Sequence, residues 1–148
     1  MTSIDQSIAI ASTPFTEPLV GPNGHPVSYD MEGNFVEWHP DEEDETGTAS
    51  PYPMILRRSD ASISARCGEC LDRLWYVRHS VFMEKLYEGK ETIDADILRG
   101  ALKNAHRIEQ TYGIETLCLS DWEYGYVSVK LSALTWVLGS EWEESLDT

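Results

Sequence analysis

Near the N-terminus, apolar and polar residues alternate in the segment HPVSYDMEGNFVEWHP, residues 25–40. A period of two is typical of a half-buried β-strand, and Gly33-Asn34 has the glycine first, as a type II′ turn prefers. A two-residue turn at this point would place Met31 opposite Val36. The segment therefore predicts a β-hairpin with one apolar face, formed by Val27, Tyr29, Met31, Val36 and Trp38.

From residue 59 onward the period of the apolar positions becomes helical. A first helix is expected from about residue 60 or 62 to Glu88, with Gly89 as a left-handed stop. A second is expected from about residue 92 or 94 to Tyr112, followed by Gly113. Its apolar face consists of Ile97, Ala101, Ala105, Ile108 and Tyr112.

The clearest helix start is SDWE, a capping box between Ser120 and Glu123. This third helix should end at Leu138-Gly139, and Lys130 is its only charge after Tyr124. A helix that is apolar nearly all round is normally buried, so we expect it at the centre of the domain. SEWE repeats the capping pattern and predicts a last short helix over residues 140–146.

The pattern as a whole predicts a mainly α fold. We expect an extended or disordered arm over residues 1–24, and a β-hairpin with an acidic loop over 25–58. Residues 59–148 should form a small helical bundle of three main helices and the short C-terminal one. A chain of 148 residues is long enough for such a core.

Charge excludes one broad class of function. The chain has 11 Lys+Arg against 26 Asp+Glu, a net charge of −15, which argues against direct binding to a phosphate backbone. The densest acidic run is Asp41, Glu42, Glu43, Asp44 and Glu45. It lacks the glycine that a calcium-binding EF-hand loop needs at its sixth position, so we interpret it as a solvated loop or as a contact for a basic partner.

No run approaches the roughly 18–20 apolar residues of a membrane span, and no secretory signal is visible after Met1. Three cysteines do not indicate a disulfide framework. We therefore expect a cytoplasmic protein without a membrane anchor.

The pair in Cys67-Gly-Glu-Cys70 resembles a metal or redox site at first sight. Structural zinc needs four ligands, and the other candidates, Cys118 and His79 or His106, do not form a second half-motif. Cysteines at i and i+3 of a helix have Cβ atoms about 5–6 Å apart, beyond the roughly 3.5–4.5 Å of a disulfide. We favour a packing role at the start of a buried stripe and expect no cofactor, with a zinc or thiol site as the alternative.

Aromatic residues are numerous, with five Trp and seven Tyr. Core packing accounts for most of them, but partly exposed aromatics are typical interface anchors. The candidates for a binding surface are Tyr76, Trp122, Tyr124 and Trp142. No G-x-S-x-G, P-loop or H-E-x-x-H motif is present, so no catalytic residue is predicted.

Two segments, LDRLWYVRHSVF and KLSALTWVLGSEWEESLDT, are similar to parts of short, acidic, uncharacterised bacterial proteins that end in much the same way. The resemblance covers roughly residues 66–148 and does not include the two cysteines of CGEC. It implies a bacterial or phage origin and a shared helical domain. It brings no activity and no catalytic residue.

The sequence leads to one main hypothesis and two alternatives. The main one is a non-enzymatic interaction module or inhibitor that docks onto another protein through aromatic and acidic segments. The first alternative is an acidic mimic of nucleic acid that blocks a basic groove, as phage inhibitors of defence systems do. The second is a zinc- or thiol-dependent protein. Oligomeric state is left open.

Overall fold

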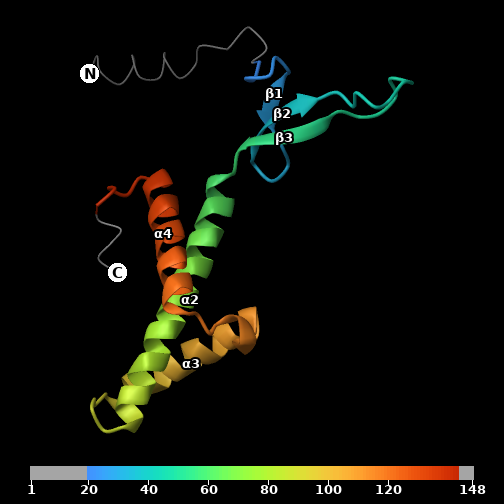
Figure 1. Cartoon of the computed structure of the whole chain (residues 1–148). Helices are drawn as coiled ribbons and strands as arrows, with labels where there is room; N and C mark the ends of the chain where they lie inside the picture. The colour runs from blue at the N-terminus through green and yellow to red at the C-terminus, as the bar shows by residue number, and fades with distance from the viewer. Residues whose placement is uncertain (1–19, 144–148) are drawn as a thin grey trace, which may run out of the picture. The chain divides into compact units, whose positions relative to one another are not determined.

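The computed structural model describes residues 20–143 of the chain. Three α-helices and a three-stranded antiparallel sheet make it mainly α with some β (Figure 1). The chain divides into two compact units, one ending at Ser59 and one beginning at Asp60. Most of the predicted arm over residues 1–24 lies outside the described residues.

The first unit contains strands β1 (Val27–Tyr29), β2 (Phe35–His39) and β3 (Tyr52–Arg57), in the order β1-β2-β3. The third strand follows the acidic loop, in a segment that the sequence pattern assigned to that loop. Pro53 lies within β3 opposite Trp38. A proline is tolerated there because β3 is an edge strand, whose residues do not all need to donate to a neighbour.

The predicted register of the first two strands is wrong. Val36 pairs with Ser28, not with Met31, because the connection is a longer loop over residues 30–34. The Asp30 carboxylate shapes this loop by accepting hydrogen bonds from the backbone N–H groups of Glu32 and Asn34, at 3.0 and 2.8 Å.

This change of register redistributes the side chains between the two faces of the sheet. Val27 pairs with Glu37 and Tyr29 with Phe35, so the proposed apolar face of Val27, Tyr29, Met31, Val36 and Trp38 does not exist as such. Val36 is fully buried, whereas Met31 is fully exposed in the loop.

The second unit contains α2 (Asp60–Tyr87), α3 (Ala95–Tyr112), a 3-10 turn (Ile114–Thr116) and α4 (Asp121–Val137). Asp94 caps α3 by accepting from the N–H groups of Asp96 and Ile97. The capping box of α4 is present, so the local signals located the helix starts correctly. The predicted last helix, over residues 140–146, lies partly outside the described residues.

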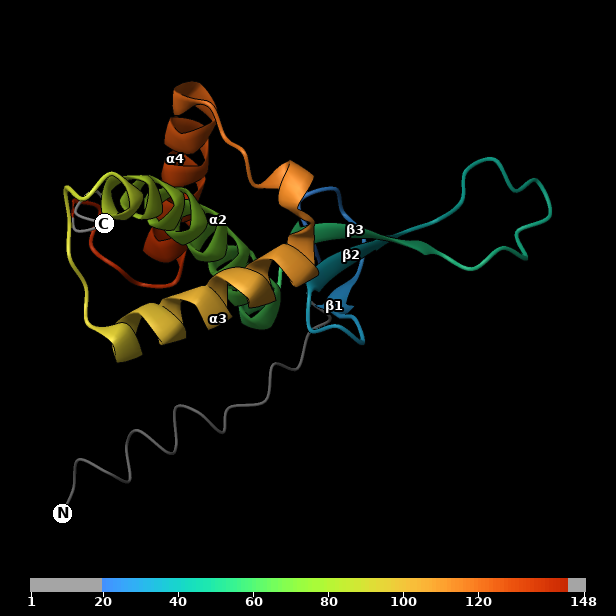
Figure 2. The ribbon, with the colours of Figure 1, turned by 90° about the horizontal axis from the view of Figure 1, so that it is seen from below.

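The long helix α2 forms the axis of this unit, with α4 packed on one part of its length and α3 on another (Figure 1). Seen from below, α3 lies in front of α2 and α4 behind it (Figure 2). Ile63, Cys67 and Leu74 of α2 pack with Leu131 of α4. The expectation that the third helix is the buried centre is therefore wrong. Leu131 is its only fully buried residue, because α4 is covered on one side only.

No helix in the described part of the chain is both long enough and apolar enough to cross a membrane.

Candidate functional site

A row of exposed apolar side chains follows the face of α4 that points away from α2. We call this row the α4 aromatic seam, and it consists of Trp122, Tyr126, Val129 and Trp136. Trp122 is 73% exposed and Val129 is 65% exposed. Their spacing of four, three and seven residues matches the a and d positions of a heptad, which is the pattern by which one helix packs on another.

The seam is ordered by its own contacts. The rings of Trp122 and Tyr126 stack with centroids 5.2 Å apart, and the ammonium of Lys130 lies 4.2 Å from the Tyr126 ring centroid. Trp136 meets Trp142 edge to face at 5.5 Å, so Trp142 extends the row beyond the end of the helix. Ordered aromatic rings have little side-chain freedom left to lose when a partner binds.

The capping box holds the start of the seam. Ser120 Oγ accepts from the Glu123 N–H at 3.2 Å, and the Glu123 carboxylate accepts from the Ser120 N–H at 2.7 Å. These hydrogen bonds to Ser120 lower the pKa of Glu123. The first turn of α4, which carries Trp122, is therefore held by two hydrogen bonds, of which the one to the Glu123 carboxylate is charge-assisted.

The four aromatic residues singled out from the sequence are not brought together. Trp122 and Trp142 lie at the two ends of the row, but Tyr124 is on the opposite face of α4, packed against the core. Tyr76, on α2, is half-buried and donates a 2.6 Å hydrogen bond to the Glu109 carboxylate. That hydrogen bond, together with burial, raises the pKa of Tyr76 to about 12.

Sequence reasoning missed Tyr126, Val129 and Trp136 as surface residues. Their heptad spacing with Trp122 is visible in the sequence, but an equal row on the other face made the whole helix resemble a buried one. That inner row consists of Tyr124, Val127, Leu131 and Leu134.

The acidic run Asp41, Glu42, Glu43, Asp44 and Glu45 lies in the loop between β2 and β3, and only Asp44 is half-buried. The Asp44 carboxylate accepts hydrogen bonds from the Thr46 hydroxyl and from the N–H groups of Ala49 and Thr46. These bonds lower the pKa of Asp44 to about 2. Asp44 therefore shapes the loop, while its neighbours carry the exposed charge.

A buried carboxylate in the sheet has no counterpart in the sequence predictions. The side chain of Glu37 is fully buried and accepts from Asn23 N at 2.9 Å, Asn23 Nδ2 at 2.7 Å and His25 N at 3.2 Å, and it is bonded to His39 Nε2 at 3.0 Å. Burial alone would raise the pKa of Glu37, but these hydrogen bonds outweigh it and lower the pKa to about 2.

An acid with such a low pKa remains ionised near neutral pH and is a poor proton donor. The oxygens of Glu37 also already have partners. The cluster therefore braces the segment before β1 against the sheet. The incorrect register concealed it, because that register placed Glu37 on a polar, outer face.

The cysteines show little sign of reactivity. Cys67 is buried, Cys70 is half-buried and Cys118 is exposed, and none forms a disulfide. Burial raises the pKa of both Cys67 and Cys70, which disfavours the nucleophilic thiolate.

The metal candidates are likewise dispersed. His79 stacks on Trp75 with ring centroids 4.8 Å apart, and burial lowers its pKa. Among residues 20–143, no group of three or more His, Cys, Asp or Glu side chains is arranged to hold a metal ion.

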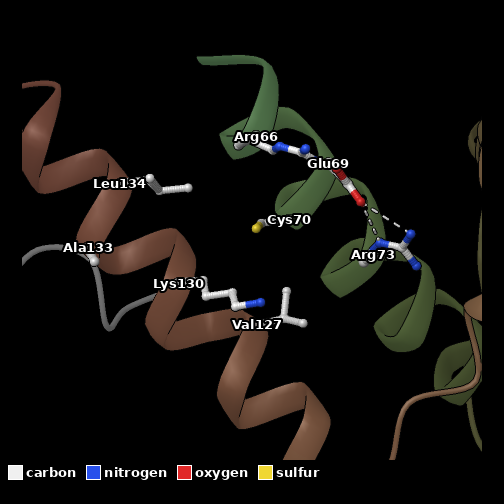
Figure 3. A pocket seen from close by; sticks show the side chains of 8 residues that line it. All are labelled: Arg66, Glu69, Cys70, Arg73, Val127, Lys130, Ala133 and Leu134. Carbon is white, nitrogen blue, oxygen red and sulfur yellow. Dashed lines mark hydrogen bonds and ion pairs between the residues drawn. The ribbon is translucent and has the colours of Figure 1, made fainter. Parts of the chain in front are cut away.

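A cavity of about 470 Å³ lies between α2 and α4 (Figure 3). Its lining combines three basic residues and one acid with a mainly apolar floor. The lining residues are Arg66, Glu69, Cys70, Arg73, Val127, Lys130, Ala133 and Leu134. No sequence motif indicated this cavity, since it depends on how the two helices pair.

Comparison of the chain with family models, with curated proteins and with solved structures finds no match. The resemblance of residues 66–148 to short acidic bacterial proteins therefore stays a prediction.

Proposed function

We propose that the protein is a non-enzymatic interaction module that docks onto another protein through the α4 aromatic seam. The observation that carries this proposal is the heptad spacing of exposed apolar side chains on a helix whose other face is already packed. An exposed apolar patch of this kind typically marks an interaction site. Trp and Tyr are also the residue types that most often dominate the binding energy of an interface.

Charge supports a partner with a basic rim. The seam itself carries no acid, and Lys130 is the only charged residue between Tyr124 and Gly139. The chain as a whole has a net charge of −15, and its acidic loop is exposed. In this arrangement apolar contact supplies the affinity, while long-range attraction speeds the encounter with a basic partner.

Mimicry of nucleic acid has weaker support. A mimic needs acids that remain available on one face, but several acids of the helical unit are paired within it. Glu69 bonds Arg66 and Arg73, and Asp72 bonds Arg107 at 2.8 Å. The zinc or thiol alternative is weaker again, because burial raises the pKa of both thiols of CGEC and so disfavours the thiolate that either chemistry needs.

The test replaces Val129 of the full chain with a photo-crosslinking amino acid, in the cells that produce the protein. Ile97 of α3 is the matched control site, since it is 64% exposed against 65% for Val129. We expect one protein to be crosslinked from position 129 and not from 97. Trp122→Ala with Trp136→Ala should abolish that crosslink. Equal capture from both sites, or crosslinks only to a second copy of the chain, would contradict the proposal.

A further inference from the structure

The cavity between α2 and α4 has the dimensions of a small-molecule site. Its volume of about 470 Å³ falls within the range of roughly 300–1,000 Å³ typical of ligand pockets. Cys70, Val127 and Leu134 supply an apolar floor, and Figure 3 shows all three pointing into the space between the two helices. These side chains also pack against the buried core of the helical unit.

The rim of this cavity is basic, in contrast to the rest of the chain. Arg66 and Arg73 stand on α2 on either side of Glu69, and Lys130 reaches across from α4 (Figure 3). Three basic side chains against one acid leave an excess of positive charge around the opening. The net charge of the chain is −15. The positive cluster nevertheless attracts anions locally, at distances shorter than the screening length.

The basic groups are held in position before any ligand arrives. Glu69 accepts from Arg66 at 2.8 Å and from Arg73 at 3.3 Å. Arg73 also donates to the Thr116 carbonyl oxygen at 3.0 Å and lies over the Tyr112 ring at 4.8 Å. Arg73 Nη1 also donates to Thr116 Oγ1 at 3.3 Å, and Arg73 Nη2 lies 3.3 Å from Glu69 Oε1, so most of its N–H groups are used within the protein.

Lys130 is the basic group of the rim whose positive charge is least paired. Its ammonium contacts the Tyr126 ring, and within residues 20–143 it forms no ion pair with a carboxylate. An ammonium has three donors, and a ring face is a weaker partner for them than a charged oxygen. Lys130 therefore stands at the edge of an apolar cavity, and no carboxylate among residues 20–143 neutralises its charge.

Cys70 adds to the apolar character of the floor. Burial, and after it the neighbouring Glu69 charge, raises the pKa of the Cys70 thiol. A protonated thiol behaves as a small apolar group, so it favours a hydrocarbon or aromatic surface in contact with it.

We propose that this cavity binds a small amphiphilic anion, with its apolar body on Cys70, Val127 and Leu134 and one acidic head group at Lys130. The shared chemistry is a single anionic head on an apolar body, whether the head is a carboxylate, a sulfate or a phosphate. The seam and the cavity lining have no residue in common, although Lys130 of the lining contacts Tyr126 of the seam; seam variants therefore distinguish this inference from the docking proposal.

The test measures binding to the full chain by isothermal titration calorimetry, with ten-carbon ligands below their micelle concentrations. Decanoate, decyl sulfate and decyl phosphate distinguish the head groups, while decanol and decyltrimethylammonium test the need for negative charge. We expect one anion bound per chain, and decanol bound roughly 10-fold or more weakly, since a hydrogen bond to a charged group is lost.

Variants locate the site. Lys130→Met keeps the length of the side chain but removes the charge, and should weaken decanoate roughly 10-fold or more. Val127→Phe enlarges a side chain that points into the space between the helices (Figure 3), so it fills the cavity and should abolish binding. The matched control is Lys103→Met, on the exposed surface of α3, and Trp136→Ala tests whether the ligand binds the seam instead; neither should change the affinity.

Circular dichroism melting curves confirm that each variant is folded. The proposal is overturned if decanol binds as tightly as decanoate, or if Lys130→Met retains wild-type affinity. It is also overturned if Trp136→Ala removes binding while Val127→Phe does not, or if none of the three anions binds.

Discussion

The two faces of α4 carry nearly the same pattern of residues and have different surroundings. On the inner face, Leu131 is buried and Val127 and Leu134 pack against α2. On the outer face, the α4 aromatic seam has equally apolar side chains at equivalent spacing, and each of them is at least half exposed. Hydrophobic periodicity shows which faces of a helix can be covered, but not how many neighbours the fold provides to cover them.

The largest expected effect contrasts the two faces directly. Leu131→Ala should lower the free energy of unfolding by about 2–5 kcal/mol, because it leaves a cavity in the packed core. Val129→Ala, two residues earlier on the outer face, should change it by about 0.5 kcal/mol or less. Urea unfolding followed by circular dichroism measures both. Similar losses for the two variants would show that the outer face is covered in the isolated chain.

A smaller effect on the free energy of unfolding is expected at the N-terminus of α4, where both of its faces begin. Ser120→Ala removes the cap of α4 and should cost about 1 kcal/mol, with the same measurement. Ser140→Ala, beyond the other end of the helix, is the control and should be close to neutral. A neutral Ser120→Ala would mean that packing against α2, and not the capping box, fixes the start of the seam.

Low pH tests a contrasting site in the sheet unit. There the buried carboxylate of Glu37 has hydrogen-bond partners within the protein, whereas the side chains of the seam are exposed. The pKa of Glu37 falls from 4.5 to about 2 on folding, so its stabilising effect is complete above pH 4.5. It is lost as the pH falls from 4.5 toward 2, when the carboxylate is protonated and its bonds weaken.

Hydrogen exchange of the β2 amides between these pH values measures that loss. Glu37→Gln should flatten the pH dependence in β2. Asp44→Asn should leave it in place, although Asp44 also has a pKa of about 2, because Asp44 bonds only within its own loop. An unchanged pH profile in Glu37→Gln would assign the acid sensitivity to another group.

Local signals were reliable where a short stretch of chain determines its own conformation. The cap at Asp94, the capping box at Ser120 and the glycine after α2 each act over a few residues, and the helices begin and end close to where these signals place them. The mainly α class follows from those helices.

Features that depend on distant residues could not be predicted in the same way. The hairpin register failed because Asp30 stabilises a longer loop than Gly33-Asn34 suggested. The Glu37 cluster needs residues from before β1 and from β2, and the cavity needs α2 beside α4. Of the proposed surface residues, Trp122 is on the seam but Tyr124 is not, since the face of α4 that meets α2 is decided by packing.

The most direct test of the central claim uses the partner protein that is crosslinked from position 129. Once this partner has been purified, its affinity is measured for two matched variants of the chain. Val129→Glu places a charge in the seam, and Ile97→Glu places the same charge at an equally exposed apolar position on α3. We predict that Val129→Glu weakens binding roughly 100-fold, as expected for a charge buried in an apolar interface, while Ile97→Glu does not. Equal affinities for the two variants would contradict the assignment of the α4 aromatic seam as the docking surface.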